Sequence, residues 1–267
     1  MLKIVTTALL AVGLTACAAA GPSSAAGKST LVIGVKADQP GLGLAGPGGQ
    51  FSGFEVEVGT YIARKLGASK VGFKAVTSYN REKLLNQGAV DLVLASYSIT
   101  PQRDTLVTFG GPYYLAHQDT MVRSDETRIR TVHDLAGRRM CEAAGSVSTQ
   151  RVTAGLGIAA RLVPSPSYSD CYAKLLSGQV DAVSTGDLVL AGFVAQANGA
   201  VRIIGDPFSD ERYGVGLRKG DIDGCEAVNR AITAMYQDGT AARLLRKWFG
   251  TTGLPLAGST PQFEGCA

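Results

Sequence analysis

The fold is decided by the stretch that runs from Leu31-Val-Ile-Gly-Val35 to Val90-Asp-Leu-Val-Leu-Ala95. Each of these two segments is a short apolar run bounded by polar or Gly residues, which predicts a buried strand followed by a loop. Between them, Phe54–Leu66 carries apolar residues at helical spacing, Val71–Val76 predicts a strand, and Arg81–Asn86 predicts a short helix. Strands and helices therefore alternate as β-α-β-α-β, which predicts a parallel sheet with right-handed crossovers.

The same alternation recurs in the middle of the chain. Strands are predicted at 120–122, 139–141, 161–163 and 180–183, and helices or helical turns at 131–136, 148–156 and 170–176. The apolar strand at Gly214–Leu217 is similar to the one at Thr120–Val122. If these two strands lie side by side as crossovers, the segment between them is an insertion, and the helices predicted at 225–236 and 240–249 return to the first part of the fold.

These elements predict an α/β protein of two lobes, for which 267 residues are sufficient. Lobe 1 is expected at 30–121 and 214–267, and lobe 2 at 122–213. Ligands of open α/β sheets bind beyond the carboxyl ends of the strands. Two lobes that face each other therefore predict a ligand site in the cleft between them.

Composition excludes several classes of function. Hydrophobic residues make up 45% of the chain and charged residues 18%, which is typical of a globular protein. The net charge is +4, but basic residues never run beyond pairs such as Arg138-Arg139, so we expect no nucleic-acid partner. The chain has only two histidines, His117 and His133, which argues against a zinc site or a Ser-His-Asp triad. We expect neither a metal nor a cofactor.

The first residues have the pattern of an export signal. Met1–Ala16 has a basic start and an apolar stretch that is too short for a permanent transmembrane helix. The segment Leu14-Thr-Ala-Cys17 resembles the lipobox of bacterial lipoproteins, in which the cysteine is diacylated and becomes the mature N-terminus. We therefore predict lipid attachment at Cys17, a flexible tether at 17–29 and anchoring to the outer face of the cytoplasmic membrane. The alternative is a plain secretory peptide with an incidental cysteine.

Export also bears on the other cysteines. Outside the cytoplasm an even set of cysteines is normally paired, and four remain after Cys17. Four cysteines allow three connectivities. We favour Cys141–Cys171 and Cys225–Cys266, because each closes a local loop within one expected lobe, and buried free thiols are the alternative.

Several segments carry a resemblance to a known family. Four of them resemble polar amino-acid-binding proteins of ABC importers (solute-binding protein family 3): Gly53–Val58, Ala95–Arg103, Phe109–Tyr114 and Tyr213–Leu217. Two more are similar to the glutamate-binding lipoproteins of actinobacterial importers: Lys36–Gly43 and Gly110–Gln118. The resemblance implies a two-lobed periplasmic-binding-protein fold with a two-crossover hinge (type II), a non-enzymatic monomer, and ABC permease subunits as partners. Hinge closure around the ligand would present the closed form to the permease.

The resemblance also implies which residues hold the α-carboxylate of an amino acid. Arg103 stands where the family has its carboxylate-binding arginine, and a guanidinium can hold both carboxylate oxygens. Ser96 and Ser98 would add a carbonyl for the ammonium and donors for the carboxylate. Ser146 and Thr149 lie in a segment that resembles the family's Gly-Thr-Thr helix start, where backbone N–H groups favour anions. Ordinary helix capping is the alternative for Ser146.

Three residues bear on the ligand's side chain. In acidic amino-acid binders of this family, an arginine at the place of Arg81 and a serine at the place of Ser78 contact the distal carboxylate. A basic residue follows the first strand, as Lys36 does here. Cations beside Arg103 suit a dicarboxylate, because a neutral or cationic ligand side chain would leave them uncompensated. Glutamate is therefore the expected ligand, with aspartate, glutamine and asparagine as alternatives.

The chain departs from the family at the acceptor for the α-ammonium. Gly186 stands where the family normally has an aspartate, and Asp187 follows it. Either Asp187 substitutes through a local backbone shift, or the ammonium is held by carbonyls and hydroxyls such as that of Thr185. A buried ammonium without an anionic partner would be costly, so this departure affects the affinity or the ligand class.

Two other functions remain open at this point. The same fold resembles cyclic dehydratases that act on arogenate or prephenate, and these need a carboxylic acid in the cleft, for which Glu55 and Glu142 are the candidates. A ligand sensor for a receptor kinase is the other possibility, and neighbouring genes or a pull-down would distinguish it from transport. An exported scaffold without a ligand is disfavoured, because folds with such a cleft usually bind something.

Overall fold

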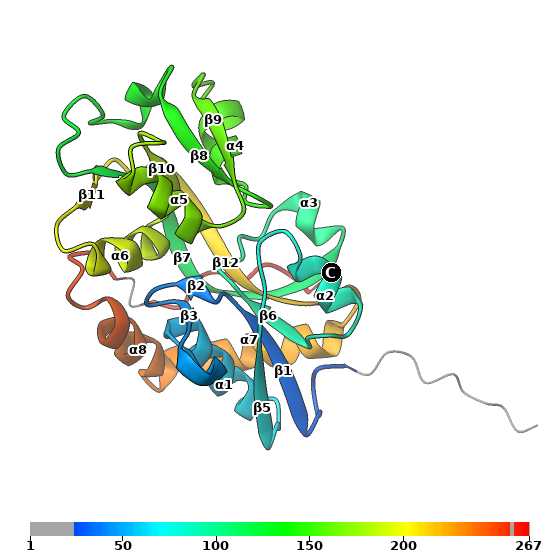
Figure 1. Ribbon diagram of the computed structural model, residues 1–267. Helices are drawn as coiled ribbons and strands as arrows, with labels where there is room; N and C mark the ends of the chain where they lie inside the picture. Colours follow the sequence, from blue (N-terminus) through cyan, green and yellow to red (C-terminus); the bar gives the residue numbers. More distant parts are fainter. Residues whose placement is uncertain (1–23, 257–258, 267) are drawn as a thin grey trace, which may run out of the picture.

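A computed structural model describes residues 24–256 and 259–266 of the chain (Figure 1). The predicted signal peptide and Cys17 lie outside these residues. The main sheet has seven strands in the order β10-β7-β12-β6-β1-β5, and β11 pairs with β7. These strands are β1 (Thr30–Val35), β5 (Lys70–Ala75), β6 (Leu92–Leu94), β7 (Val107–Arg123), β10 (Val183–Gly186), β11 (Val201–Ile203) and β12 (Ser209–Arg218).

The predicted parallel arrangement is confirmed, because β1 pairs in parallel with both β5 and β6. Helix α1 (Phe54–Lys65) buries Val58 and Ile62 on one face, as its apolar spacing predicts. It packs against the C-terminal helices α7 (Ile222–Gln237) and α8 (Thr240–Phe249), which therefore return to this part of the fold (Figure 1). The remaining elements here are β2 (Asp38–Gln39), β3 (Gly43–Ala45), β4 (Phe51–Ser52), the 3-10 turn η1 (Pro47–Gly49), α2 (Arg81–Asn86) and α3 (Pro101–Asp104).

Two long antiparallel strands, β7 and β12, run through the middle of the molecule (Figure 1). We call residues 24–106, 219–256 and 259–266 the first half, residues 124–208 the second half, and β7 and β12 the connecting strands. The strands that contain 120–122 and 214–217 lie side by side, although these two segments are not opposite each other. Gly216 lies opposite Phe109, whereas Thr120 lies opposite Ser184 of β10. The reason is that β7 continues through the Gly-Pro segment after Phe109, so its two ends pair with different neighbours.

The second half contains a separate parallel pair of strands, β8 (Arg139–Ala143) and β9 (Arg161–Ser165). Its helical elements are η2 (Val132–Leu135), α4 (Ser148–Gln150), the π-helical turn η3 (Arg151–Gly155), α5 (Tyr168–Leu176) and α6 (Asp187–Gln196). The strand predicted at 180–183 is wrong in its bounds, because β10 begins only at Val183 and Ala182 makes a single bridge to Met140. Helix α6 packs closely on the first half: a Cβ on Gly192 would lie 1.9 Å from the carbonyl oxygen of Pro40.

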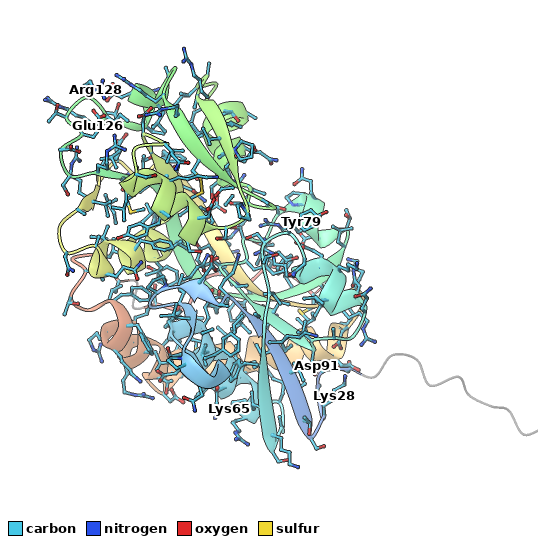
Figure 2. All side chains as sticks on the ribbon, in the orientation of Figure 1. Lys28, Lys65, Tyr79, Asp91, Glu126 and Arg128 are labelled. Carbon is cyan, nitrogen blue, oxygen red and sulfur yellow. A yellow bond between two sulfur atoms is a disulfide. The ribbon has the colours of Figure 1, made fainter. Side chains whose placement is uncertain are left out.

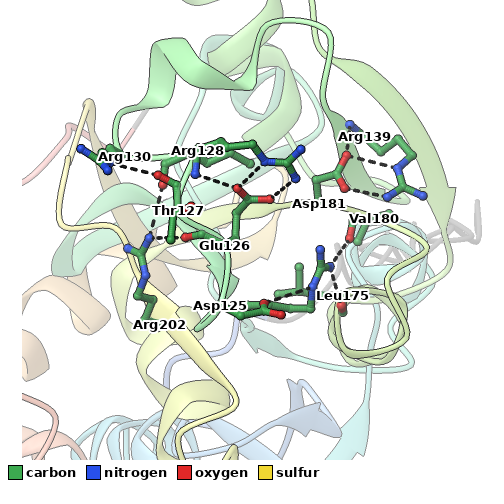
Figure 3. Close-up of polar contacts among 12 residues, drawn as sticks. Asp125, Glu126, Thr127, Arg128, Arg130, Arg139, Leu175, Val180, Asp181 and Arg202 are labelled. Carbon is green, nitrogen blue, oxygen red and sulfur yellow. Dashed lines mark hydrogen bonds and ion pairs between the residues drawn. The ribbon is translucent and has the colours of Figure 1, made fainter.

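Ion pairs stabilise the far end of the second half (Figure 3). Arg128 lies 2.7 Å from Glu126, and Arg139 lies 2.6 Å from Asp181. Arg202 donates to the carbonyl oxygen of Glu126 at 2.8 Å. The hydrogen bonds from Arg128 lower the pKa of Glu126 to about 2, so this carboxylate stays ionised over the whole physiological range.

The structure contains two disulfides, Cys141–Cys171 and Cys225–Cys266, with Cα atoms 5.6 and 5.8 Å apart. They are the two pairs that the sequence favours. The first joins β8 to α5 within the second half, and the second joins α7 to the C-terminal segment. Each disulfide therefore constrains one half, and neither joins the two halves.

The end of the predicted tether is bound to the first half. The Ser24 hydroxyl and the Ala25 N–H donate to the Asp221 carboxylate at 2.6 and 2.8 Å. The Lys28 ammonium donates to Asp91 at 2.7 Å, and the two side chains lie together at the start of β1 (Figure 2). These contacts hold the last residues of the predicted tether against the first half. No helix in the described ranges, 24–256 and 259–266, is both long and apolar enough to cross a membrane.

Candidate functional site

A small cavity, which we call the central cavity, lies between the two halves. Its volume is about 10 Å³, which is room for about one water molecule. Both halves and both connecting strands line it, with Ser78, Arg81, Ser96, Ser98, Arg103, Gln118, Ser146, Val147, Ser148, Tyr168, Thr185 and Tyr213. All of these except Val147 have polar side chains. The central cavity is therefore built for a polar ligand.

The structure brings together most of the site residues predicted from the sequence. Seven of the ten predicted binding residues line the central cavity: Ser78, Arg81, Ser96, Ser98, Arg103, Ser146 and Thr185. Lys36, Thr149 and Asp187 do not. Sequence reasoning missed Gln118, Val147, Ser148, Tyr168 and Tyr213. Gln118 and Tyr213 belong to segments that carry the family resemblance, which is the signal that could have indicated them.

Arg103 reaches across the cavity from the first half to the second. Thr100 caps the short helix α3 by accepting from the Arg103 N–H at 3.3 Å, which fixes the backbone of Arg103. The guanidinium donates to the carbonyl oxygens of Ser98 at 2.8 Å and Gly145 at 3.2 Å. Burial and the neighbouring Arg81 lower the pKa of Arg103 to about 10, so the group stays cationic at neutral pH. Its two forked N–H groups can also hold a carboxylate.

Arg81 lies behind Arg103 and is 1% exposed. It donates to the Ala95 carbonyl at 3.0 Å, and its guanidinium carbon lies 3.7 Å from the centre of the Tyr97 ring. Glu82 is 3.4 Å from Arg81 and 3.9 Å from Arg103. One carboxylate thus faces two buried guanidinium groups, which leaves an excess of positive charge at this side of the central cavity.

Lys36 is a third buried cationic side chain beside the central cavity. Its ammonium donates to the Ser78 hydroxyl at 2.7 Å, and Ser78 lines the cavity. Burial, together with the charge of Arg81, lowers the pKa of Lys36 to about 7. A ligand carboxylate near Ser78 would stabilise the protonated form of Lys36.

The floor of the central cavity is a strained loop that is held from below. Ser96 has φ +44°, a left-handed conformation that is uncommon for a residue with a side chain. Its N–H donates to the buried Glu55 carboxylate at 2.6 Å, and its hydroxyl donates to Gln39 at 3.1 Å. Glu55 also accepts from the Tyr113 hydroxyl. Glu55 therefore positions the loop from beneath the cavity and does not line it.

Hydroxyl groups form the opposite wall. The Ser148 hydroxyl accepts from the Tyr168 hydroxyl at 2.9 Å and from the Gln118 amide nitrogen at 3.2 Å, and it donates to Thr185 at 3.3 Å. Ser146 contacts Tyr168 at 2.6 Å. Thr149 points elsewhere and contacts Glu142 at 3.5 Å. The Thr149 side chain therefore does not face the central cavity, and a contact of its backbone N–H with the ligand stays a prediction.

The glycine at 186 is required by Tyr213. A Cβ at this position would lie 2.0 Å from the Tyr213 hydroxyl oxygen. Asp187 is directed away from the central cavity: its carboxylate accepts from the N–H of Leu188 at 2.7 Å and from the N–H of His117 at 3.2 Å. Burial raises the pKa of Asp187. Of the two arrangements left open by the sequence, the geometry favours the one without an aspartate at the ammonium position.

A larger cavity of about 380 Å³ adjoins the central cavity. Ser78 and Tyr168 line both, and Lys36 lines only the larger one. Contacts between the halves surround it: the Ser169 hydroxyl donates to Asp38 at 3.0 Å. A Cβ on Gly145 (φ +74°) would lie 2.5 Å from the backbone of Ser78. The two halves are thus in close backbone contact beside the site.

Comparison with known proteins identifies the family. A model of the bacterial extracellular solute-binding proteins, family 3, matches residues 31–251. The chain belongs to this family. The resemblance inferred from the sequence is therefore confirmed.

Individual relatives agree with this assignment. The glutamate-binding protein GluB of Corynebacterium glutamicum is 38% identical over 272 aligned residues, covering 96% of this chain and 92% of the relative. Among solved structures, an ancestral arginine-binding protein bound to arginine matches with a TM-score of 0.75 and 34% identity, over 84% of this chain and 99% of that one. An ancestral amino-acid-binding protein described as a precursor of cyclohexadienyl dehydratase matches with a TM-score of 0.75 and 29% identity, over 83% and 95% of the two chains. The predicted two-lobed α/β fold is thereby confirmed.

Proposed function

We propose that this protein is the ligand-binding component of an ABC amino-acid importer and that it binds glutamate in the central cavity. The observation that carries the proposal is the placement of Arg103, Arg81 and Lys36 around one small polar cavity between two halves. Arg103 would hold the α-carboxylate, together with Ser98 and Ser146. Arg81, with Lys36 acting through Ser78, would hold the distal carboxylate. The similarity to a glutamate-binding protein supports this choice of ligand. Arginine is disfavoured because its cationic side chain would be repelled by the buried cations.

Ligand entry requires the halves to separate. The central cavity has room for about one water, and an amino acid is several times larger. Arg103 bridges the halves through Gly145, so this contact must break when the site opens. We propose a hinge in the connecting strands β7 and β12, with lobe 1 at 30–121 and 214–267 and lobe 2 at 122–213. A ligand that contacts both lobes would favour the closed form, which the permease subunits would receive.

The remaining parts of the proposal concern the membrane and the oligomeric state. The family is extracellular, and the Leu14-Thr-Ala-Cys17 segment supports attachment to the outer face of the cytoplasmic membrane through Cys17. The protein would act there as a monomer. A receptor kinase could receive the closed form in place of a permease. Co-purification with permease subunits or with a kinase distinguishes the two.

A dehydratase is not supported by the position of the candidate acids. The similarity to a precursor of cyclohexadienyl dehydratase brings this activity into consideration. However, Glu55 lies beneath the Ser96 loop and Glu142 faces Thr149. Among the described residues, none that lines the central cavity has a carboxyl group that could serve as a general acid. We therefore propose binding without catalysis.

A thermal-shift screen of the purified protein against the twenty amino acids tests this function. Ligand that binds only the native state raises the melting temperature as its concentration exceeds Kd. We expect the largest shift with glutamate and its loss in Arg103→Ala. Arg243→Ala, an exposed arginine on α8, is the control and should retain the shift. A screen in which no amino acid shifts the melting temperature would contradict the proposal.

A further inference from the structure

The central cavity has cations at one side and lacks an anion at the other. Among the described residues, its lining includes Arg81 and Arg103 but neither an aspartate nor a glutamate. Glu82, the carboxylate next to these two arginines, already contacts both of them. An amino acid brings an ammonium group into such a site together with its carboxylates. The lining offers this ammonium only neutral acceptors.

Tyr213 fills the position at which residue 186 could present a carboxylate. The distance of 2.0 Å between its hydroxyl oxygen and a Cβ at Gly186 means that a side chain there must displace the tyrosine. Tyr213 is 2% exposed and packs between Tyr113 and Tyr114, with ring centres 6.4 Å from each. A phenol hydroxyl can both donate and accept a hydrogen bond, whereas a carboxylate can only accept. This part of the site is therefore neutral, and the ligand group that contacts it need not be a hydrogen-bond donor such as an ammonium.

Nearby carboxylates are engaged elsewhere. Asp187 accepts from the backbone N–H groups of Leu188 and His117. Glu211 is 1% exposed and pairs with Arg151 at 2.7 Å. Neither of these acids lines the central cavity. Asp187 is held by its two hydrogen bonds and Glu211 by the ion pair, although the second carboxylate oxygen of Glu211 is buried without a partner among the described residues. Because neither carboxylate lines the central cavity, neither is placed against a ligand ammonium there.

One acceptor in the lining of the central cavity has no partner within the described ranges and carries no charge. The side-chain oxygen of Gln118 is buried and has no hydrogen-bond partner in the described part of the chain, while its nitrogen donates to Ser148. Gln118 lines the central cavity on β7, as Thr185 does on β10. Gln118, Thr185 and Tyr213 together form a neutral polar surface, which we call the neutral wall.

From this arrangement we infer that the protein recognises its ligand by two carboxylates and is indifferent to an α-ammonium, so that five-carbon dicarboxylates without an amino group bind about as well as glutamate. The inference rests on the proposed function, since it assigns the same site to a wider class of ligand. A site that pairs a substrate group with its own buried polar group rejects an analogue without that group by orders of magnitude, because the protein's group is left unpaired. The neutral wall leaves no charge unpaired when the ammonium is missing, and a water molecule in the space of the ammonium can pair with the Gln118 oxygen.

Isothermal titration of the purified protein with glutamate and with glutarate tests the inference. We expect the two dissociation constants to agree within about tenfold, a ratio that corresponds to about 1.4 kcal/mol. Glutamate binding at least a hundredfold tighter than glutarate would overturn the inference and leave the proposed function intact. Absence of binding by both ligands would overturn both.

A pair of variants tests the cause. Gly186→Asp with Tyr213→Phe removes the hydroxyl oxygen that blocks the position and introduces a carboxylate. We expect this variant to prefer glutamate over glutarate by a hundredfold or more. Gly186→Asn with Tyr213→Phe has nearly the same shape without the charge, and its ratio should stay within about tenfold. Equal ratios in the two variants would contradict the assigned role of position 186, and the wild-type ratio decides the inference even if the variants do not fold.

Discussion

Replacing Arg81 by methionine separates ligand binding from folding. Arg81 is buried, stacks on the Tyr97 ring at 3.7 Å and donates to the Ala95 carbonyl at 3.0 Å. Removing Arg81 saves the desolvation cost of one buried cation, and Arg103, 3.9 Å from Glu82, still offsets the Glu82 carboxylate that Arg81 contacts at 3.4 Å. If Arg81 is retained for the ligand, Arg81→Met should fold as well as the wild type.

The expected loss of affinity follows from the same physical argument. Removing one partner of a buried charge pair costs about 3–5 kcal/mol, because the other charge stays buried without compensation. With a factor of ten for each 1.4 kcal/mol, glutamate affinity should fall by about 100- to 4,000-fold. The melting temperature without ligand should be unchanged or higher.

Isothermal titration and thermal unfolding measure these two quantities on one preparation. Lys65→Met is the matched control, because Lys65 lies 5.3 Å from the Tyr61 ring on α1 and does not line the central cavity (Figure 2). It should retain the wild-type affinity. Glutamate binding by Arg81→Met within tenfold of the wild type would contradict the assigned role of Arg81 in ligand binding. Loss of binding only because the variant no longer folds would contradict it as well.

Three further predictions concern closure, pH and the disulfides. Gly145→Ala places a methyl group 2.5 Å from the Ser78 backbone at φ +74°, so it should hinder closure and weaken glutamate binding at least tenfold by titration; unchanged affinity would contradict this. The pKa of Lys36 is about 7 without ligand, and a bound carboxylate raises it. Glutamate affinity should therefore be constant below pH 7 and should fall above pH 7 by at most tenfold per pH unit. Lys36→Met should abolish this dependence. A flat profile in the wild type would show that Lys36 does not sense the ligand. Replacing Cys141 and Cys171 together by serine opens a loop with a sequence separation of 30 residues. In denaturant titrations this should lower the free energy of unfolding by about 3–4 kcal/mol. An unchanged free energy of unfolding would contradict the chain-entropy explanation of the disulfide's effect.

Parts of the fold were predictable because their hydrophobic pattern is local. The alternation of β1, α1, β5 and β6 follows from apolar spacing and glycine stops alone. The length of β7 does not, because its Gly-Pro segment favours a loop, whereas the strand continues and pairs with β12 on both sides of this segment. Helix α6 is apolar on nearly all sides and packs against the first half at Gly192, so it lacks the amphipathic period by which a surface helix is recognised.

Site residues also differ in whether the sequence alone could indicate them. Arg103 and Arg81 could be predicted because the resemblance supplies their positions and a buried arginine has few roles other than holding an anion or a carbonyl. Gln118 and Tyr213 lie on strands, where a shift of one residue changes the face on which a side chain lies. Whether Asp187 faces the ligand depends on where β10 ends and α6 begins, which only the three-dimensional structure provides.

A crystal structure of the protein with glutamate would show where the ligand binds. We predict glutamate in the central cavity, with one carboxylate within hydrogen-bond distance of Arg103 and the other within that distance of Arg81 or Ser78. Glutamate bound in another place, or with its carboxylates away from these side chains, would contradict this prediction.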